Sequence, residues 1–459
     1  MSDQNGLKGG LGLWQVVFLA AGGMIGAAVF SLSGLTAAMA GPSAILAWVL
    51  AGMLMILVAV NFAELATAFP RIGGVAHYPL ETLGPNRGVR AFFGFVTGWS
   101  WAWTELIGAA FSALVLYQFL GVALVPWGVV ISVVVLAAVY ILNIVGISPT
   151  VKVNFILFLL LALTMVIFFF AGIGKVEMGN YSPFFATGSL GFLSAIPIAA
   201  LGFGAWMVIT SLAAEIKEPK KNIPRAILYS LIFTLVLYFL MLFVTYGTVP
   251  SSSWSFANDY AVYAAPDFAA TMFAGGALWI MIVIKIAAVL ALVTTVTALF
   301  ADASRVFCAL GQTGIMPSFL GKINAKSGQP LAALTWVFVF TILMNIFLYD
   351  KLAQIITVGS IFLALAFLIS LFASIGLKTF RRDVKPPYRA PGGIAAPIIG
   401  IIALGFLIWN VFTTALDPWG AGALYILGGV GLLWFIIIAI TKTGIFSKDS
   451  KVGRLGKEA

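Results

Sequence analysis

Cysteine, histidine and charged residues are scarce in this sequence of 459 residues. The single cysteine, Cys308, excludes an intrachain disulfide and a metal site built from several cysteines. The single histidine, His77, lies in a polar stretch, where we expect an exposed side chain without a ligand role. Charged residues make up 9% of the chain, against about 25% in soluble domains. These shortages disfavour an enzyme, and no cofactor is expected.

Apolar residues make up 62% of the chain and occur in long runs. A membrane-crossing helix needs about 20 mainly apolar residues, and the runs predict twelve spans, with no cleavable signal sequence before the first. The predicted spans are 12–40, 43–69, 91–120, 124–146, 151–174, 191–213, 224–248, 275–301, 329–349, 352–378, 394–415 and 420–441. We therefore expect an all-α membrane protein.

Lysine and arginine are distributed unequally between the two sides of this layout. With the N-terminus inside the cell, nearly all basic residues outside the spans face the cytoplasm, and only Lys175 and Lys351 face the other side. This asymmetry predicts a plasma-membrane protein with both termini in the cytoplasm. The net charge of +10 then reflects topology and contact with anionic membrane lipids, and no nucleic-acid partner is expected.

Glycines interrupt two of the spans. The first span has roughly 29 residues, which at 1.5 Å per residue is too long for one upright helix, and it carries Gly22, Gly23 and Gly26. The sixth carries Gly202 and Gly204 in mid-membrane. Paired interrupted helices in two halves of opposite topology mark the binding site of secondary transporters. The alternative is that these glycines are packing contacts, because Gly22 and Gly26 form a Gly-x-x-x-Gly pattern.

Several segments resemble one family, in order and at the expected spacing. The segment Gly-Gly-Met-Ile-Gly-Ala-Ala-Val-Phe at 22–30 is similar to helix one of the amino acid–polyamine–organocation superfamily. Segments 62–74, 214–226 and 303–317 are similar to the stretches that follow its helices two, six and eight, and 387–393 is a weaker match after helix ten. The resemblance implies transport of amino acids or related amines by alternating access.

The resemblance also implies a leucine-transporter-like fold with discontinuous helices one and six. Its parts are a cytoplasmic N-tail at 1–11, a first five-helix repeat at 12–174, a second, inverted five-helix repeat at 191–378, two extra C-terminal helices at 394–441 and a cytoplasmic C-tail at 442–459.

The interrupted helices predict recognition of a zwitterion by backbone groups. The second half of helix one is expected to begin near Ala27, where free N–H groups at the positive end of a helix dipole suit a carboxylate. Carbonyls freed at both breaks face an ammonium, while Phe203 and Trp206 are either an aromatic lid or ordinary packing residues. The predicted substrate-binding residues are Ala21, Gly22, Gly23, Ile25, Gly26, Ala27, Ala28, Trp101, Ala102, Glu105, Leu201, Gly202, Phe203, Gly204 and Trp206.

Two ionisable residues lie deep in predicted spans, Glu105 in the third and Lys285 in the eighth. A charged side chain at such depth is energetically costly. Each is therefore interpreted as a functional residue and is expected to have a partner. We expect the two to pair, either as a titrating element that couples transport to a proton or as a structural ion pair. Thr294 and Thr295 are an alternative, since hydroxyls and helix-one carbonyls suit sodium. Some proton-coupled family members carry a lysine in helix five, but the matching position here is Leu161.

The predicted function is therefore proton-coupled transport of neutral, apolar L-amino acids. A cationic amino acid or polyamine becomes the better substrate if Lys285 does not neutralise Glu105. Sodium coupling, exchange without an ion, and a receptor that does not transport remain open. A channel is disfavoured because no re-entrant filter sequence is present. Another large class of twelve-helix transporters is disfavoured because residues 70–74 lack its Gly-x-x-x-Asp-Arg-x-Gly-Arg-Arg signature.

Overall fold

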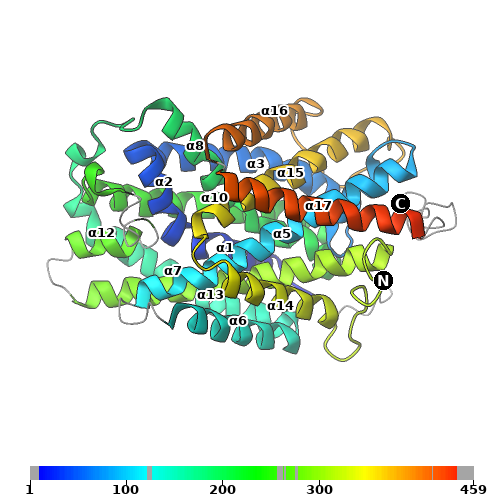
Figure 1. Cartoon of the computed structure of the whole chain (residues 1–459), viewed down its shortest axis with the longest axis horizontal. Coiled ribbons are helices and arrows are strands. Elements are labelled where there is room, and N and C mark those ends of the chain that lie inside the picture. Colours follow the sequence, from blue (N-terminus) through cyan, green and yellow to red (C-terminus); the bar gives the residue numbers. More distant parts are fainter. Residues whose placement is uncertain are drawn as a thin grey trace.

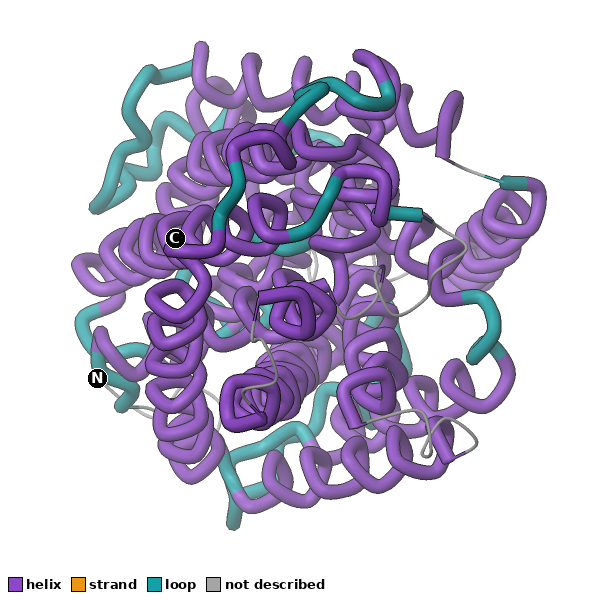
Figure 2. The backbone as a smooth tube through the Cα atoms, turned by 90° about the vertical axis from the view of Figure 1, so that its left-hand side faces the viewer, coloured by secondary structure: helices purple, strands orange, loops and turns teal. Residues whose placement is uncertain are grey.

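The computed structural model describes residues 10–120, 127–255, 262, 265–273, 278–415 and 417–441. Within these ranges the chain forms helices and loops and no strand (Figure 2). The helices are α1 (Leu13–Ala27), α2 (Ser33–Ala40), α3 (Ala44–Ala68), α4 (Gly74–Thr82), α5 (Arg87–Leu120), α6 (Gly128–Val145), α7 (Ile147–Gly172), α8 (Gly188–Leu201), α9 (Val208–Ser211), α10 (Pro219–Thr248), α12 (Ala265–Phe273), α13 (Leu278–Thr313), α14 (Leu331–Phe347), α15 (Leu352–Thr379), α16 (Ala395–Asn410) and α17 (Pro418–Thr441).

Most of these helices coincide with the predicted apolar runs, as α10 does with 224–248 and α14 with 329–349. In the described part of the chain, nine helical stretches are long and apolar enough to cross a membrane, and the stretch Leu13–Ala68 joins α1, α2 and α3. The all-helical membrane architecture is therefore confirmed. The division into twelve crossings and two inverted repeats stays a prediction.

The long helices run largely along one axis of the molecule, and the start of α1 and the end of α17 lie at the same end of the bundle (Figure 1). We call this the terminal end. Helix α1 is central: it packs against α13, α10 and α7, while α13 also packs against α5. The glycine-rich sequence of α1 suits this position, since small residues allow neighbouring helices to approach closely.

The outer helices carry large apolar side chains on their exposed faces. Among them are Val134 and Ile141 of α6, Leu163 of α7, Ile402 of α16 and Ile436 of α17. Exposed apolar surface of this extent is unfavourable in water and is the expected surface of a protein embedded in lipid. The exposed faces therefore agree with a multi-pass membrane protein.

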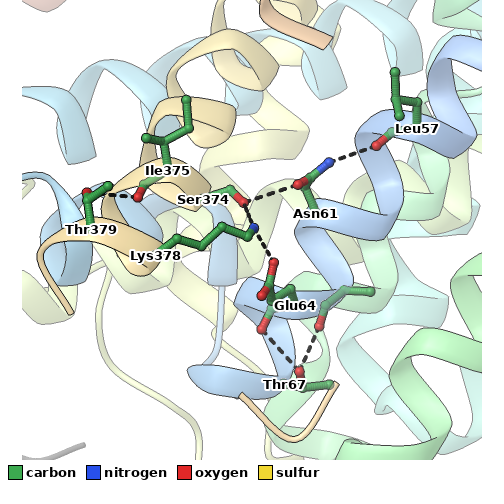
Figure 3. A network of polar contacts seen from close by, with 9 residues as sticks. Leu57, Asn61, Glu64, Thr67, Ser374, Ile375, Lys378 and Thr379 are labelled. Carbon is green, nitrogen blue, oxygen red and sulfur yellow. Dashed lines mark hydrogen bonds and ion pairs between the residues drawn. The ribbon is translucent and has the colours of Figure 1, made fainter. Parts of the chain in front are cut away.

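A polar network joins α3 to α15 inside the bundle (Figure 3). Lys378 pairs with Glu64 and donates a hydrogen bond to Ser374 Oγ at 2.9 Å. Ser374 in turn donates to Asn61 Oδ1 at 3.2 Å. Buried charges are stable only with partners, so this network lets two ionisable residues lie between packed helices.

The expectation that His77 is exposed is wrong. His77 lies in α4, which packs between α5 and α15, and only 5% of the residue is exposed. Every residue of α4 is buried. Burial and the nearby charge of Arg71 lower the pKa of His77 to about 3.

His77 should make the protein sensitive to acid. The pKa of His77 is about 3 in the folded protein and about 6.5 in an unfolded chain, so below about pH 6.5 the unfolded state binds the extra proton. The resulting loss of stability is at most about 1.4 kcal/mol per pH unit as the pH falls towards 3. Thermal unfolding in detergent should show this slope for the wild type and a shallower slope for His77→Gln. Equal slopes would contradict the burial of a neutral imidazole.

Candidate functional site

The irregular part of helix one lies after its glycines. Helix α1 remains helical through Gly22, Gly23 and Gly26, and the regular α-helix gives way to a π-helical turn at Ala28–Leu32 before α2 begins. The glycines themselves are therefore not the break, and the irregular turn begins directly after Ala27, near which the second half of the helix was expected to begin. Short π-helical turns occur frequently at functional sites, so this turn is still a candidate for the binding site.

The glycines of α1 are instead positions of close helix contact. A Cβ atom added at Gly26 would lie 1.7 Å from Thr295 Oγ1 and 2.1 Å from the Ala291 carbonyl oxygen. A Cβ atom at Gly23 would lie 2.9 Å from Ala298 Cβ. The packing role that the Gly-x-x-x-Gly pattern offered as an alternative is thus the one observed here.

The sixth predicted span is interrupted where its glycines lie. Helix α8 ends at Leu201, a turn over Gly202 and Phe203 follows, and a 3-10 turn over Gly204–Met207 leads into the short helix α9. This break is confirmed. Two interruptions therefore lie in helices that face one another, since α1 packs against the 3-10 turn.

Hydroxyl groups from neighbouring helices bind carbonyl oxygens in the helix-six break and in α1 just before its irregular turn. The Tyr238 hydroxyl of α10 lies within hydrogen-bond distance of the Met24 carbonyl oxygen and 2.8 Å from that of Gly202. Thr294 and Thr295 of α13 donate to the carbonyl oxygens of Gly22 and Gly23 at 3.1 and 3.0 Å. An unpaired carbonyl in the membrane costs several kcal/mol, so the Tyr238 contact stabilises the irregular backbone at Gly202. The other three contacts tie α1 to α10 and α13.

A cavity of about 60 Å³ lies between the two interruptions, α5, α13 and α15. The predicted site residues that line it are Gly23, Ala28, Trp101, Glu105, Leu201, Gly204 and Thr295. The predicted residues outside its lining are Ala21, Gly22, Ile25, Gly26, Ala102, Gly202, Phe203, Trp206, Lys285 and Thr294; the side chain of Ala27 lies outside the described residues. The cavity therefore joins part of the predicted site from four separate segments.

The α5 wall contributes more of the cavity than sequence reasoning expected. Thr104, Gly108, Phe111 and Ser112 line it together with Glu105. Their spacing follows the helical repeat, which places residues three, four and seven apart on one face. This pattern was visible around Glu105 and could have identified the polar residues Thr104 and Ser112.

The two aromatic residues of the helix-six break pack away from the cavity in this conformation. Phe203 contacts Trp48 and Tyr238, with ring centroids 6.0 and 5.0 Å apart. Trp206 packs against Phe62 at 5.2 Å and stacks on Phe367 at 5.7 Å. They are packing residues here, which was the alternative to an aromatic lid.

The predicted pair of Glu105 and Lys285 is not formed, so that prediction is wrong. Lys285 Nζ lies 2.9 Å from Asp267 Oδ2 and donates to the Phe119 carbonyl oxygen at 3.1 Å. Asp267 belongs to α12, a short helix outside the predicted spans, and its carboxylate satisfies the lysine. Glu105 Oε2 is buried without a hydrogen-bond partner. Within the described residues, Glu105 takes part in no ion pair.

Asn154 of α7 is a site neighbour that sequence reasoning missed. Its Nδ2 donates to the Thr294 carbonyl oxygen at 3.1 Å, and its Oδ1 would lie 2.8 Å from a Cβ atom added at Gly22. Leu161, the position matched to the helix-five lysine, is a buried apolar residue. The sequence sign that could have identified Asn154 was a single asparagine in the largely apolar span 151–174.

The terminal end of the bundle is closed below the cavity. Trp101 stacks on Phe367 at 5.4 Å, and Phe367 stacks on Trp206. Nearer the terminal end, the buried Arg305 Nε and Nη2 lie 2.6 and 3.2 Å from the two carboxylate oxygens of Glu215. This bidentate pair, together with the aromatic residues, separates the cavity from the terminal end.

Comparison with known proteins decides the family. Residues 15–452 match the family model for amino acid permeases. The chain belongs to the amino acid permease family. The resemblance to the amino acid–polyamine–organocation superfamily, and with it the assignment to membrane transporters, is therefore confirmed.

Curated relatives cover most of the permease. It is 27% identical to the branched-chain amino acid permease BcaP of Bacillus subtilis, over 89% of this chain and 90% of that protein. It is 28% identical to the branched-chain amino acid permease BcaP of Lactococcus lactis, over 86% of this chain and 87% of that protein. It is 24% identical to the aspartate-proton symporter of Bacillus subtilis, over 90% of this chain and 82% of that protein.

The Gly26 contact can be tested by adding one methyl group. Gly26→Ala places a Cβ atom against the Ala291 backbone, which cannot rotate away, so overpacking should destabilise the permease by about 1–3 kcal/mol or more. Thermal unfolding in detergent measures the loss. Gly405→Ala in α16 is the matched control, because no atom lies within 4 Å of the added Cβ there. Equal stability of the two variants would show that α1 and α13 do not approach as closely as described.

The Tyr238 hydroxyl should stabilise the fold. Tyr238→Phe removes the donor shared by two buried carbonyls, and an unsatisfied buried acceptor costs about 1–3 kcal/mol. Tyr229→Phe on the same helix is the control, since Tyr229 is 42% exposed. Unfolding curves that move by the same amount in both variants would argue against a role for Tyr238 at the interruptions.

Proposed function

We propose that this permease transports neutral, apolar L-amino acids across the plasma membrane by alternating access, coupled to a proton. The observation that carries the proposal is a cavity walled by both helix interruptions and containing the carboxyl group of Glu105, which has no cationic partner in the part of the chain that the structure describes. In this proposal the permease has twelve spans arranged as two inverted five-helix repeats and two further helices. The terminal end faces the cytoplasm, in keeping with the excess of lysine and arginine there.

The main-chain groups around the cavity suit the two charged ends of an amino acid. The carboxylate lies against the wall at Ala28 and Leu32, where the π-helical turn leads into the N-terminus of α2, and the ammonium lies towards the Leu201 side. Ile107 and Leu299 offer apolar surface for a side chain. Branched-chain substrates in the names of two relatives support an apolar amino acid.

Glu105 is the proposed site of the coupling proton. A carboxylate in an apolar cavity without a cation is unfavourable, whereas the protonated acid is tolerated. Protonation from the side to which the cavity opens therefore accompanies substrate binding. Lys285 is not available for this task, because it pairs with Asp267.

A cationic substrate is the second candidate, and the isolated carboxyl of Glu105 is the observation that favours it. A basic side chain in the cavity would supply the missing partner for Glu105. Sodium coupling is a third possibility, because the oxygens of Thr294 and Thr295 lie beside helix-one carbonyls and such oxygens suit a hard cation. Uptake experiments separate all three.

Purified permease in liposomes tests the proposal directly. Radiolabelled leucine should accumulate when an inward proton gradient is imposed, and an imposed sodium gradient should have no effect. Glu105→Gln should keep leucine exchange but lose the response to the proton gradient. Accumulation of arginine in preference to leucine would select the cationic candidate, a response to sodium would select Thr294 and Thr295, and binding without accumulation would identify a receptor.

Recognition of the substrate carboxylate by backbone groups gives a separate prediction. Leucine methyl ester should compete with leucine at least about tenfold less well, because the wall at Ala28 and Leu32 loses its anion, and N–H groups at a helix N-terminus favour negative charge. Competition in the same liposomes measures the loss, with leucinol as a second analogue without a carboxylate. An ester that competes as well as leucine would overturn this mode of recognition.

A further inference from the structure

Asp302 is a buried carboxyl group that neither the predicted site nor the cavity lining includes. It lies in α13, one residue beyond the predicted end of that span, because α13 continues to Thr313. The residue is fully buried. Its Oδ2 accepts a hydrogen bond from Trp101 Nε1 at 3.1 Å, and its Oδ1 has no hydrogen-bond partner. Trp101 therefore holds one carboxyl oxygen, while the Ser211 hydroxyl lies near the group without a hydrogen bond of good geometry.

Among the described residues, the groups around Asp302 do not include a free cation. Arg305 acts on it from the same helix, but its guanidinium is held by Glu215 and the Ala301 carbonyl. Ser211 lies beside the carboxyl group. Tyr78 of α4 and Glu105 of α5 are the titratable groups that face it from the other helices. A carboxylate in such surroundings is costly, and the protonated acid is the form that burial favours.

Trp101 connects Asp302 to the substrate cavity. Its side chain lines the cavity one helical turn before Glu105, while its indole N–H points to Asp302. The stack of Trp101 on Phe367 closes the floor of the cavity. Asp302 thus lies behind this floor, between it and the Arg305–Glu215 pair that closes the terminal end.

We propose that Asp302 is a proton-binding site that controls opening of the terminal end. With that end closed, Asp302 is protonated and holds the Trp101 indole. When the aromatic floor and the Arg305–Glu215 pair separate, water reaches Asp302, its O–H bond breaks and the proton leaves to that water. Closure requires the proton to return from the same side. The cycle of Asp302 therefore moves no net proton, unlike the proposed cycle of Glu105.

The inference rests on the alternating-access part of the proposed function and not on the coupling role of Glu105. The direction of the pH effect follows from the proposal. A proton that binds the closed form more tightly favours closure at low pH and opening at high pH. One proton can change the ratio of open to closed molecules by at most about tenfold per pH unit.

Cys308 provides a built-in reporter of this opening. It is the only cysteine of the sequence, it is fully buried, and it lies near the Arg305–Glu215 pair on α13. A maleimide that cannot reach it in the closed form should label it when the terminal end opens. No further cysteine has to be introduced, and Cys308→Ser gives the background.

The experiment measures the rate of N-ethylmaleimide labelling of the purified full-length permease in lipid nanodiscs at several pH values between 5 and 7. Thiol reactivity itself rises with pH, so each rate is divided by the rate of Asp302→Asn at the same pH. This ratio should rise at least about fivefold from pH 5 to pH 7, since only the wild type can ionise at this position. Asp350→Asn, at an exposed carboxyl, should show the wild-type profile.

A ratio that stays constant with pH overturns the proposal. If Asp302→Asn does not fold, Asp302→Leu replaces it, because an apolar side chain of similar size is tolerated at a buried carboxyl and is equally unable to ionise. The labelling does not depend on transport, so it decides the role of Asp302 even if no uptake is found. In liposomes, Asp302→Asn should keep the wild-type ratio of protons to substrate; a changed ratio would make Asp302 part of the coupling and overturn the proposed role.

Discussion

The need to satisfy main-chain carbonyls inside the membrane is the constraint on which this structure depends. Helix one and helix six are both interrupted beside the cavity, and lipid cannot supply hydrogen bonds to the carbonyls involved. Tyr238 of α10 binds the Gly202 carbonyl in the helix-six break, and Tyr238, Thr294 and Thr295 bind carbonyls of α1 just before its irregular turn. The irregular segments therefore need their neighbours, which explains why α1 lies at the centre of the bundle.

Charged groups in the interior likewise depend on partners. Lys285 with Asp267, Arg305 with Glu215 and Lys378 with Glu64 are paired across different helices. Glu105 and Asp302 form no ion pair within the described part of the chain, and each has a carboxyl oxygen without a hydrogen-bond partner. Paired groups hold helices together, while isolated carboxyl groups can change charge with little rearrangement. Trp101 lies next to both acids, one helical turn before Glu105 and hydrogen-bonded to Asp302.

Sequence reasoning was accurate where a feature depends on local composition. The apolar runs predicted helices such as α10 and α14 closely, and Gly202 and Gly204 located the break in helix six. It failed where tertiary contacts decide. Glycines at 22–26 have the same composition as a break, but the close approach of α13 makes them contact points. Lys285 found its partner in α12, which no apolar run predicted, and the burial of His77 follows from packing between α5 and α15.

The shared hydrogen bond of Tyr238 has a mechanical consequence. One hydroxyl proton serves two acceptors, the Met24 carbonyl of helix one and the Gly202 carbonyl of helix six, from a third helix that is not interrupted. If the two interrupted helices move apart, the hydroxyl can stay with one acceptor while water entering the widening gap takes the other. Tyr238 can thus stay hydrogen-bonded to one interrupted helix while that helix shifts relative to the other.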